Sequence, residues 1–324
     1  MAVASVVQNR LKAALFAVGS VGLASAQDAI VKGVSHDLPA YEAVIFRTVA
    51  SLPLLFGWLL WSGAASNLFP ARMLPLLFLR SIILCTAYFG FVLSIAALPL
   101  ATSVSIYFTM PFVVAALAGW TLGEKVPPYR WFAITVGFAG VLIMVRPGSD
   151  AFQPAAIYAL WSAVGYAIGQ MIGRHLSLRV ESAVIANWQN VTYFAVACLI
   201  GLIAPAFSGM AIEDKSLAFL LRPWVWPDAQ QFVLLIIMGV LSALASAGFI
   251  LAYRNAEANF VAPFEYTALL WAVTNGVLFF GDFPDSYTWL GAAIVVSAGI
   301  WMLWRDRQGQ PPLRESIKKM QLKE

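Results

Sequence analysis

The sequence LLFLRSIILCTAYFGFVLSIAAL, at residues 76–98, contains one charged side chain, Arg80, in an otherwise apolar or weakly polar run. A helix rises about 1.5 Å per residue, so a run of this length covers the roughly 30 Å hydrocarbon core of a bilayer. The run therefore predicts a transmembrane helix.

Nine further runs of this kind fill most of the 324-residue chain, in which 61% of the residues are hydrophobic and 11% are charged. Globular domains carry about 25% charged residues, because a surface that faces water needs them. Lipid offers the backbone no hydrogen-bond partner, and the runs do not alternate as barrel strands do, so each run is expected to be a helix. The sequence thus predicts an all-α integral membrane protein with ten transmembrane helices. The expected spans are 13–31, 41–61, 76–98, 101–122, 131–145, 155–172, 183–203, 232–253, 260–280 and 287–304.

The N-terminus imitates a secretory signal peptide. Arg10 and Lys12 precede an apolar run, and this run contains the small residues Ala24, Ser25 and Ala26. We expect the segment to be retained, because the apolar run continues past this point. Its removal would also leave the two halves of the chain unequal.

The basic residues predict the orientation in the membrane. Fourteen Lys and Arg fall on the side of the N-terminus, six of them from Arg305 onward, and four fall on the opposite side. Because the more basic side is usually cytoplasmic, both termini are expected in the cytoplasm and the spans in a bacterial inner membrane. The net charge of +4 suits an anionic lipid leaflet, and no nucleic-acid partner is expected.

The two halves of the chain resemble each other. A shift of 158 residues lays Gly123-Glu124 on Gly281-Asp282. It also lays Thr109 on Thr267. Five spans per half force the second half to enter the membrane from the opposite side, which gives the inverted repeat common among secondary transporters. We expect a first five-helix repeat at 1–150, a second, inverted repeat at 151–304 and a basic cytoplasmic tail at 305–324.

Motifs of enzymes and ATPases are absent from the sequence. It has no G-x-x-x-x-G-K-[ST], H-E-x-x-H or G-x-S-x-G motif. The two histidines, His36 and His175, lie near loop borders. Cys85 and Cys198 lie within apolar runs and lack metal-ligand spacing. We therefore expect no enzyme, no cofactor and no metal site.

Charged side chains inside predicted spans are costly, and they are usually functional or paired. Arg80 lies close to a membrane border and is expected to extend toward it. Asp28 lies four residues before Lys32, so a local ion pair competes with a role in proton coupling. Arg47 is expected to pair with Asp28 or with Glu42.

Prolines and glycines mark where helices bend or touch. Pro111 lies midway along the fourth span and Pro263 early in the ninth, and a proline inside a helix removes a hydrogen bond and kinks the helix. Interrupted helices in corresponding positions of two halves are a pointer to a binding site. Gly165 and Gly169 form a G-x-x-x-G step on the sixth span, which favours close packing, with a gating bend as the alternative.

Polar and aromatic side chains gather near these prolines. Glu265, beside Pro263, either makes a structural hydrogen bond to a neighbouring helix or serves as a ligand for an ammonium group or as a proton carrier. A tyrosine hydroxyl at mid-membrane needs a partner, so these tyrosines are expected to face the interior of the bundle. The gathered side chains are Tyr88, Tyr107, Tyr166, Gln170 and Tyr266.

Three short motifs at the ends of spans carry a resemblance to a known family: Leu122-Gly123-Glu124, Gly281-Asp282 and Ala97-Leu98-Pro99. On these motifs and the two halves, the chain resembles EamA-type members of the drug/metabolite transporter superfamily, although Asp282 departs from the glutamate of the first half. The resemblance implies a basket of helices with spans 1, 3, 4, 6, 8 and 9 around a central cavity. Within the superfamily the chain is most similar to bacterial YddG-like exporters of aromatic amino acids.

This resemblance implies a set of substrate-binding residues on the inner helices. Trp161 and Ser246 are added to the aromatic and polar residues above because they lie on spans 6 and 8, which the resemblance places around the cavity. The candidate substrate-binding residues are Tyr88, Tyr107, Trp161, Tyr166, Gln170, Ser246, Glu265 and Tyr266. Asp28 and Glu265 are the candidates for proton coupling.

The sequence thus predicts a secondary transporter that exports a small metabolite, an aromatic or neutral amino acid, by alternating access. Aromatic walls would bind the apolar part of the cargo, and a few polar groups would orient it. The alternative is a drug, S-adenosylmethionine or another metabolite on the same fold. A channel or an intramembrane enzyme would need pore-lining rings or converging acid and base groups. The expected partners are a small-molecule substrate and membrane lipid. The coupling ion and the oligomeric state stay open, with a monomer as the working expectation.

Overall fold

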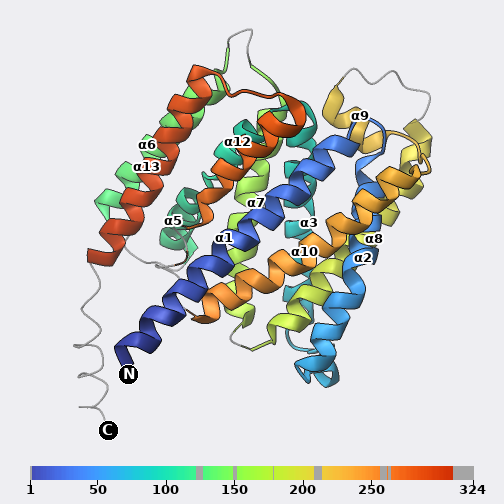
Figure 1. The fold of residues 1–324 in the computed structure, drawn as a ribbon, viewed down its shortest axis with the longest axis horizontal. Coiled ribbons are helices and arrows are strands. Elements are labelled where there is room, and N and C mark those ends of the chain that lie inside the picture. The colour runs from blue at the N-terminus through green and yellow to red at the C-terminus, as the bar shows by residue number, and fades with distance from the viewer. Residues whose placement is uncertain are drawn as a thin grey trace.

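The computed structural model describes residues 2–121, 127–148, 152–177, 179–207, 214–255, 261 and 264–308. Every regular element in these ranges is a helix (Figure 1). The α-helices are α1 (Ala2–Val34), α2 (Ala40–Trp61), α3 (Leu74–Ala97), α4 (Leu100–Tyr107), α5 (Met110–Thr121), α6 (Pro128–Val145), α7 (Ala155–Ser177), α8 (Ser182–Ile203), α9 (Lys215–Leu221), α10 (Ala229–Asn255), α12 (Thr267–Phe280) and α13 (Ser286–Gln308). Short 3-10 helices follow α2 and α8, at η1 (Ala64–Asn67) and η2 (Ala204–Phe207).

Eight of these helices are long and apolar enough to cross a membrane: α1, α2, α3, α6, α7, α8, α10 and α13. They coincide with eight of the ten predicted spans. The prediction of an all-α membrane protein is therefore confirmed for the described part of the chain. The other two predicted spans, the fourth and the ninth, correspond to shorter apolar helices.

The fourth predicted span is two helices rather than one. α4 ends at Tyr107 and α5 begins at Met110, with Phe108 and Thr109 in a turn between them. Pro111 lies in the first turn of α5, where a helix leaves its N–H groups without internal partners and a proline is well tolerated. The expected continuous helix over 101–122 is therefore wrong at its centre.

The ninth predicted span is interrupted at Tyr266, since the two residues before it, Phe264 and Glu265, are helical. α12 begins at Thr267, and Tyr266 forms a turn directly before it. Pro263, which was expected to kink this span, lies outside the described residues. So do the motif at 122–124 and the tail from 309 onward.

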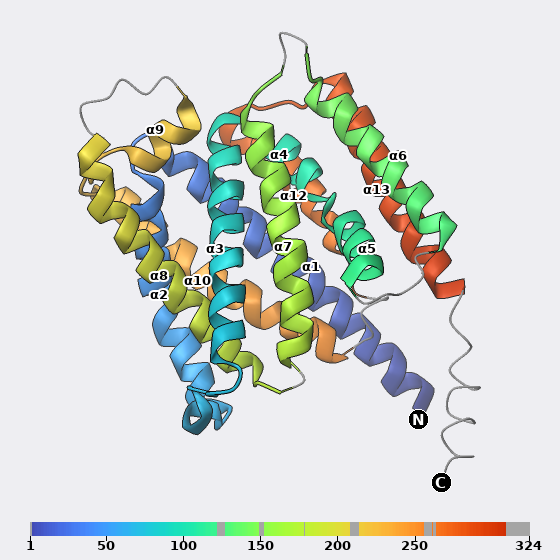
Figure 2. The same ribbon diagram turned by 180° about the vertical axis from the view of Figure 1, so that it is seen from behind.

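The helices pack as pairs that run side by side. α1 packs along α10 on the face seen in Figure 1, and α3 packs along α7 on the face seen in Figure 2. α2 packs against α8, and α6 with α13 forms a pair at one flank. Exchanging the two predicted halves would turn the α1–α10 pair into the α7–α3 pair, which is the pairing that an inverted repeat would produce. The repeat itself stays a prediction.

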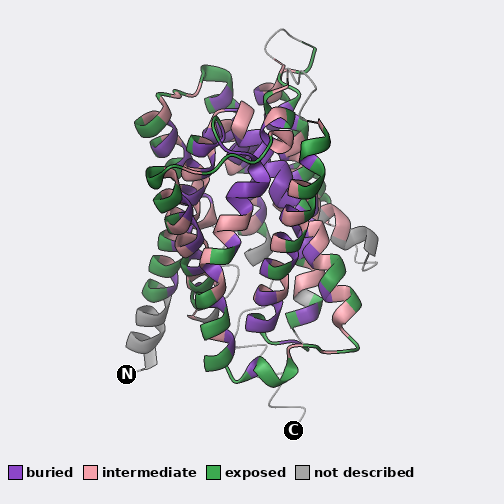
Figure 3. Cartoon of the chain, turned by 90° about the vertical axis from the view of Figure 1, so that its right-hand side faces the viewer, coloured by how far each residue is buried: buried purple, intermediate pink, exposed green. Residues whose placement is uncertain are grey.

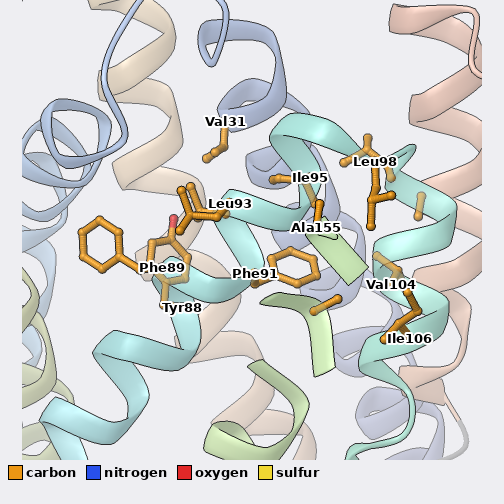
Figure 4. Close-up of a cluster of buried hydrophobic side chains, with 14 of the residues drawn as sticks. Val31, Tyr88, Phe89, Phe91, Leu93, Ile95, Leu98, Val104, Ile106 and Ala155 are labelled. Carbon is orange, nitrogen blue, oxygen red and sulfur yellow. The ribbon is translucent and has the colours of Figure 1, made fainter. Parts of the chain in front are cut away.

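Large apolar side chains cover the outside of the bundle. Trp61 is 86% exposed and Leu202 is 80% exposed. Exposed residues face outward along the helices and buried residues lie between them (Figure 3). Inside, Phe91 and Ile95 of α3 pack near Val104 of α4 in one buried cluster (Figure 4). An apolar exterior of this extent requires lipid around it.

Both chain ends belong to one end of the bundle. In Figure 1, α1 begins at the lower left and α13 ends above it at the left. This placement agrees with an even number of crossings. The cytoplasmic location of that end stays a prediction.

Glycines of α7 lie in its contact with α3. A Cβ atom at Gly165 would stand 2.7 Å from the Cβ of Ala87, and one at Gly169 would overlap the side chain of Leu84. Small residues of this kind let two helices approach closely in a membrane. The packing interpretation of the G-x-x-x-G step is therefore supported, whereas its gating role stays a prediction.

Replacing Gly165 with leucine is expected to destabilise the bundle by roughly 1–3 kcal/mol, because the new side chain must fit between α7 and α3. The thermal midpoint of the purified chain in detergent, followed by differential scanning fluorimetry, measures the effect. Gly57→Leu on α2 is the matched control, since no atom lies within 4 Å of a Cβ added there. Equal midpoints for the two variants would contradict this account of the α3–α7 contact.

Candidate functional site

The breaks in the fourth and ninth predicted spans lie next to each other. The ring of Phe108, between α4 and α5, has its centroid 4.9 Å from that of Tyr266, directly before α12. Thr109 and Thr267 each donate a hydroxyl hydrogen bond to the carbonyl three residues earlier, at 2.8 and 2.6 Å. The same local structure therefore occurs twice, at positions that the 158-residue shift superposes.

Four tyrosines in the interior form two ring pairs. Tyr107 and Tyr166 meet edge to face with centroids 5.3 Å apart, and Tyr88 and Tyr193 stack at 5.5 Å. The Tyr193 hydroxyl donates to the carbonyl of Leu84 at 2.8 Å. The Tyr88 hydroxyl is buried and interacts with the side chain of Arg47. These rings come from α3, α4, α7 and α8 and give the centre of the bundle an aromatic lining.

Arg47 of α2 is the charged centre of this region. Its Nε lies 3.3 Å from Oε1 of Gln27 on α1, and its Nη2 donates to Oγ of Ser242 on α10 at 2.7 Å. Its guanidinium carbon stands 4.4 Å from the centroid of the Tyr88 ring on α3, in a cation–π contact. Its Nη1 is buried without a hydrogen-bond partner among the described residues. Side chains of four helices thus converge at Arg47.

Arg80 turns into the bundle and not toward the membrane border. Its Nε donates to the carbonyl of Gly169 at 3.2 Å, and its Nη1 donates to Oε1 of Gln189 at 3.0 Å. Gln189 in turn donates to the hydroxyl of Tyr193 at 3.3 Å. The expected extension to the border is therefore wrong, because oxygens of α7 and α8 accept these hydrogen bonds inside the bundle.

The expected ion pair between Asp28 and Lys32 is replaced by a longer-range one. Nζ of Lys32 lies 2.7 Å from Oδ2 of Asp282 and donates to the carbonyl of Leu98 at 2.9 Å. Asp28 is half-buried and interacts electrostatically with Arg47. Its role in proton coupling stays a prediction.

Glu265 lies among the aromatic side chains at the two breaks. It is half-buried and interacts electrostatically with Tyr107 and Tyr266. The 158-residue shift pairs Tyr107 with Glu265, so the two halves place a phenol and a carboxylate at equivalent positions. Its roles in cargo binding and proton coupling stay predictions.

The side chains that contact Arg47, which we call the Arg47 cluster, are Gln27, Tyr88, Tyr193 and Ser242. Three predicted binding residues lie apart from both this cluster and the two breaks. Trp161 is 53% exposed, and Gln170 is exposed on the same helix, α7. Ser246 is exposed on α10 and donates to the carbonyl of Ser242 on its own helix at 2.9 Å. The structure brings together Tyr88, Tyr107, Tyr166 and Tyr266 with neighbouring rings, but not these three.

One end of the bundle, where α1 finishes, is held by long-range polar contacts; we call it the Lys32 end. The Lys32 contacts tie α1 to the ends of α3 and α12 there. At the same end, Arg146 after α6 pairs with Asp285 before α13 at 2.5 Å. Burial alone would raise the pKa of Asp285, but hydrogen bonds from Thr288 and the Arg146 guanidinium hold it below its ordinary value. Charged pairs therefore join helices that are distant in the sequence at the Lys32 end.

The sequence did not predict three side chains that contact Arg47: Gln27, Tyr193 and Ser242. Arg47 itself indicates that such partners exist, because the residues three and four positions away on its helix include no carboxylate to pair with it. Its neutral partners come from other helices, and the sequence carries no mark of which helix faces which. Tyr193 lies on the seventh predicted span, which the family resemblance did not place among the inner helices.

Comparison with known proteins gives one family match and several related transporters. The profile of the EamA-like transporter family matches residues 11–146. The riboflavin transporter of Rhizobium johnstonii is 31% identical over 66% of this chain, a match that spans 65% of that protein. The S-adenosylmethionine uptake transporter of Rickettsia felis is 23% identical over 90% of this chain and 92% of its own length. The pseudopaline exporter of Pseudomonas aeruginosa is 28% identical over 88% of this chain and 93% of its own.

A solved crystal structure shares the fold of this chain. It covers 92% of this chain and 99% of its own length with a TM-score of 0.58, at 16% identity. The three named relatives are transporters and not enzymes, in agreement with the absence of catalytic motifs. None of the three is a YddG-like amino-acid exporter, so that finer resemblance gains no support from them.

Loss of the Lys32–Asp282 pair is expected to open the Lys32 end. Ser94 of α3 is fully buried, so a cysteine at this position should react slowly with a membrane-impermeant maleimide. Cys85 and Cys198 are changed to alanine so that this cysteine alone is labelled. Adding Lys32→Ala should make the labelling several-fold faster than in the same chain with Lys32. The reagent is added on the side opposite the N-terminus. Lys32→Asp combined with Asp282→Lys should restore slow labelling.

Arg146→Gln is the matched control for this labelling experiment. It removes a charged pair at the same end, but between α6 and α13 at the flank of the bundle. Faster labelling in Arg146→Gln equal to that in Lys32→Ala would show that the Lys32–Asp282 pair has no particular role in closing this end.

Proposed function

We propose that this chain, a member of the EamA-like transporter family, is a secondary transporter that carries a small organic metabolite across the membrane by alternating access. One observation carries the proposal: two transporters of small metabolites align with about nine-tenths of the chain. The relatives include an uptake transporter and an exporter, so both directions of transport are served by similar chains.

The interior suits this function. Broken helices, polar side chains and stacked aromatic rings come together between α1, α3, α4, α7, α10 and α12. Non-helical backbone at membrane depth is tolerated where protein surrounds it, and transporters bind cargo at such discontinuous helices. The tied Lys32 end would form one of the two gates that alternating access requires.

A larger metabolite fits the comparisons better than an aromatic or neutral amino acid. The named relatives carry riboflavin, S-adenosylmethionine and pseudopaline. The aromatic pairs Tyr88–Tyr193 and Tyr107–Tyr166 supply flat and edge surfaces for a planar ring system. S-adenosylmethionine and riboflavin, which both contain such a ring system, are therefore the first compounds to test, ahead of phenylalanine and threonine.

Proton coupling would use the two carboxylates already named. Asp28 lies beside the Arg47 cluster, and Glu265 lies at the breaks. A carboxylate whose charge depends on a neighbouring arginine or on cargo can exchange a proton as the protein changes state. Uncoupled facilitated diffusion with the same residues is the second possibility.

Proteoliposomes loaded with unlabelled compound should accumulate the labelled form of at least one panel member by counterflow. The panel is S-adenosylmethionine, riboflavin, pseudopaline, phenylalanine and threonine. Liposomes without protein measure leakage. A chain with Gly165→Leu and with Gly239→Leu, where an added Cβ would stand 2.5 Å from that of Ala50 on α2, serves as a packing-defective control. Counterflow no faster than in empty liposomes for every compound would overturn the proposed function.

A further inference from the structure

We propose that Arg47 binds a carboxylate group of the transported metabolite, so that the cargo is an organic acid or zwitterion with an aromatic or apolar part. This inference rests on the transport function proposed above and names the chemical class of its substrate. It is carried by an incompletely satisfied guanidinium at the place where α1, α2, α3 and α10 converge.

The hydrogen bonds of Arg47 are incomplete. A guanidinium carries five N–H donors and stays charged inside proteins. In this structure, Nε and Nη2 reach the neutral oxygens of Gln27 and Ser242, while the buried Nη1 has no acceptor among the described residues. The arginine is therefore held in position by neutral groups, and part of its fork is left for a ligand.

The charge of Arg47 is also unbalanced at short range. The structure has no carboxylate oxygen within the 4 Å of an ion pair around this guanidinium, in the part of the chain that it describes. Asp28 is the charged group that acts on it from α1, over a longer distance. Removing an unpaired charge from water is expensive. A carboxylate from the cargo would supply the missing charge and fit the planar fork with two hydrogen bonds.

A second buried polar group stands beside the arginine. The Tyr88 hydroxyl is buried and interacts with the Arg47 side chain, and the Tyr88 ring is the one on which Arg47 lies. Behind it stacks Tyr193, and Arg47 is also 5.8 Å from the centroid of that ring. A cargo with its carboxylate at Arg47 would therefore meet the Tyr88 hydroxyl and an aromatic surface next to it.

Arg80 provides the comparison within the same bundle. It is also an arginine in a transmembrane helix, but its Nε and Nη1 bond to Gly169 and Gln189 of the chain itself. None of its nitrogens is among the buried and unpartnered atoms of the described residues. Arg80 thus fulfils a structural role, and the contrast indicates that the open fork of Arg47 serves a ligand.

Matched probes test the carboxylate directly on the purified full-length chain. L-phenylalanine is compared with L-phenylalaninamide, and S-adenosylmethionine with 5′-methylthioadenosine, which lacks the amino acid part. Riboflavin serves as a cargo without a carboxylate. Apparent Kd values come from the rise in thermal midpoint with probe concentration. At least one carboxylate probe should bind roughly ten- to hundredfold more tightly than its partner, as expected for hydrogen bonds to a charged group.

The variants separate binding from folding. Arg47→Gln should remove the preference for the carboxylate, and Arg47→Lys should keep part of it, because a lysine retains the charge without the fork. Arg80→Gln is the matched control: it removes an intramembrane arginine and should leave the preference intact. Each variant's midpoint without probe reports whether it folds.

The outcomes distinguish this inference from the proposed function. Equal binding within both probe pairs, or a carboxylate preference that persists unchanged in Arg47→Gln, overturns the carboxylate site and leaves transport standing. Counterflow of riboflavin but of none of the compounds that carry a carboxylate also overturns it. Arg47-dependent carboxylate binding without counterflow of any panel compound would support the site and count against the transporter.

Discussion

In lipid, every backbone N–H and C=O must find its hydrogen-bond partner within the protein, and this constraint organises the whole molecule. Long helices meet it along the outside of the bundle. The chain departs from regular helix at Phe108–Thr109 and before Thr267, and both breaks lie together inside the bundle. There the rings of Phe108 and Tyr266 are in contact, and threonine hydroxyls donate to nearby carbonyls. The irregular backbone therefore lies in the interior, where protein surrounds it.

The side chains of the two intramembrane arginines also need hydrogen-bond acceptors within the protein, and they find them differently. Arg80 is bonded to a carbonyl of α7 and to an amide of α8, which joins it to Tyr193. Arg47 is held by neutral oxygens from α1 and α10 and lies over the Tyr88 ring, with one nitrogen left over. A continuous series of contacts through Gln189, Tyr193 and Tyr88 joins the two arginines across the bundle. At the Arg47 end of this series, one buried nitrogen lacks a hydrogen-bond acceptor among the described residues.

The contacts at the Lys32 end link this interior to the surface of the membrane. Lys32 joins α1, the end of α3 and the end of α12, and these helices also carry Gln27, Tyr88 and the turn at Tyr266. A movement that separated Lys32 from Asp282 would therefore act on the helices that hold the central side chains. Coupling between a gate and a binding site needs this kind of shared element.

The sequence by itself determined the class of protein and eight of the spans, because the length and apolarity of a helix in lipid are local properties. It also singled out Asp28, Arg47 and Glu265 as charges that need an explanation. Only the tertiary structure decided that Lys32 pairs with Asp282, 250 positions away, that Arg80 turns inward, and that Arg47 meets Ser242 and Tyr88. The physical reason is that a transmembrane helix is apolar on the side facing lipid and on the side facing its neighbours. Hydrophobic periodicity therefore does not mark the facing side, and the partner of each polar group is set by how the helices pack.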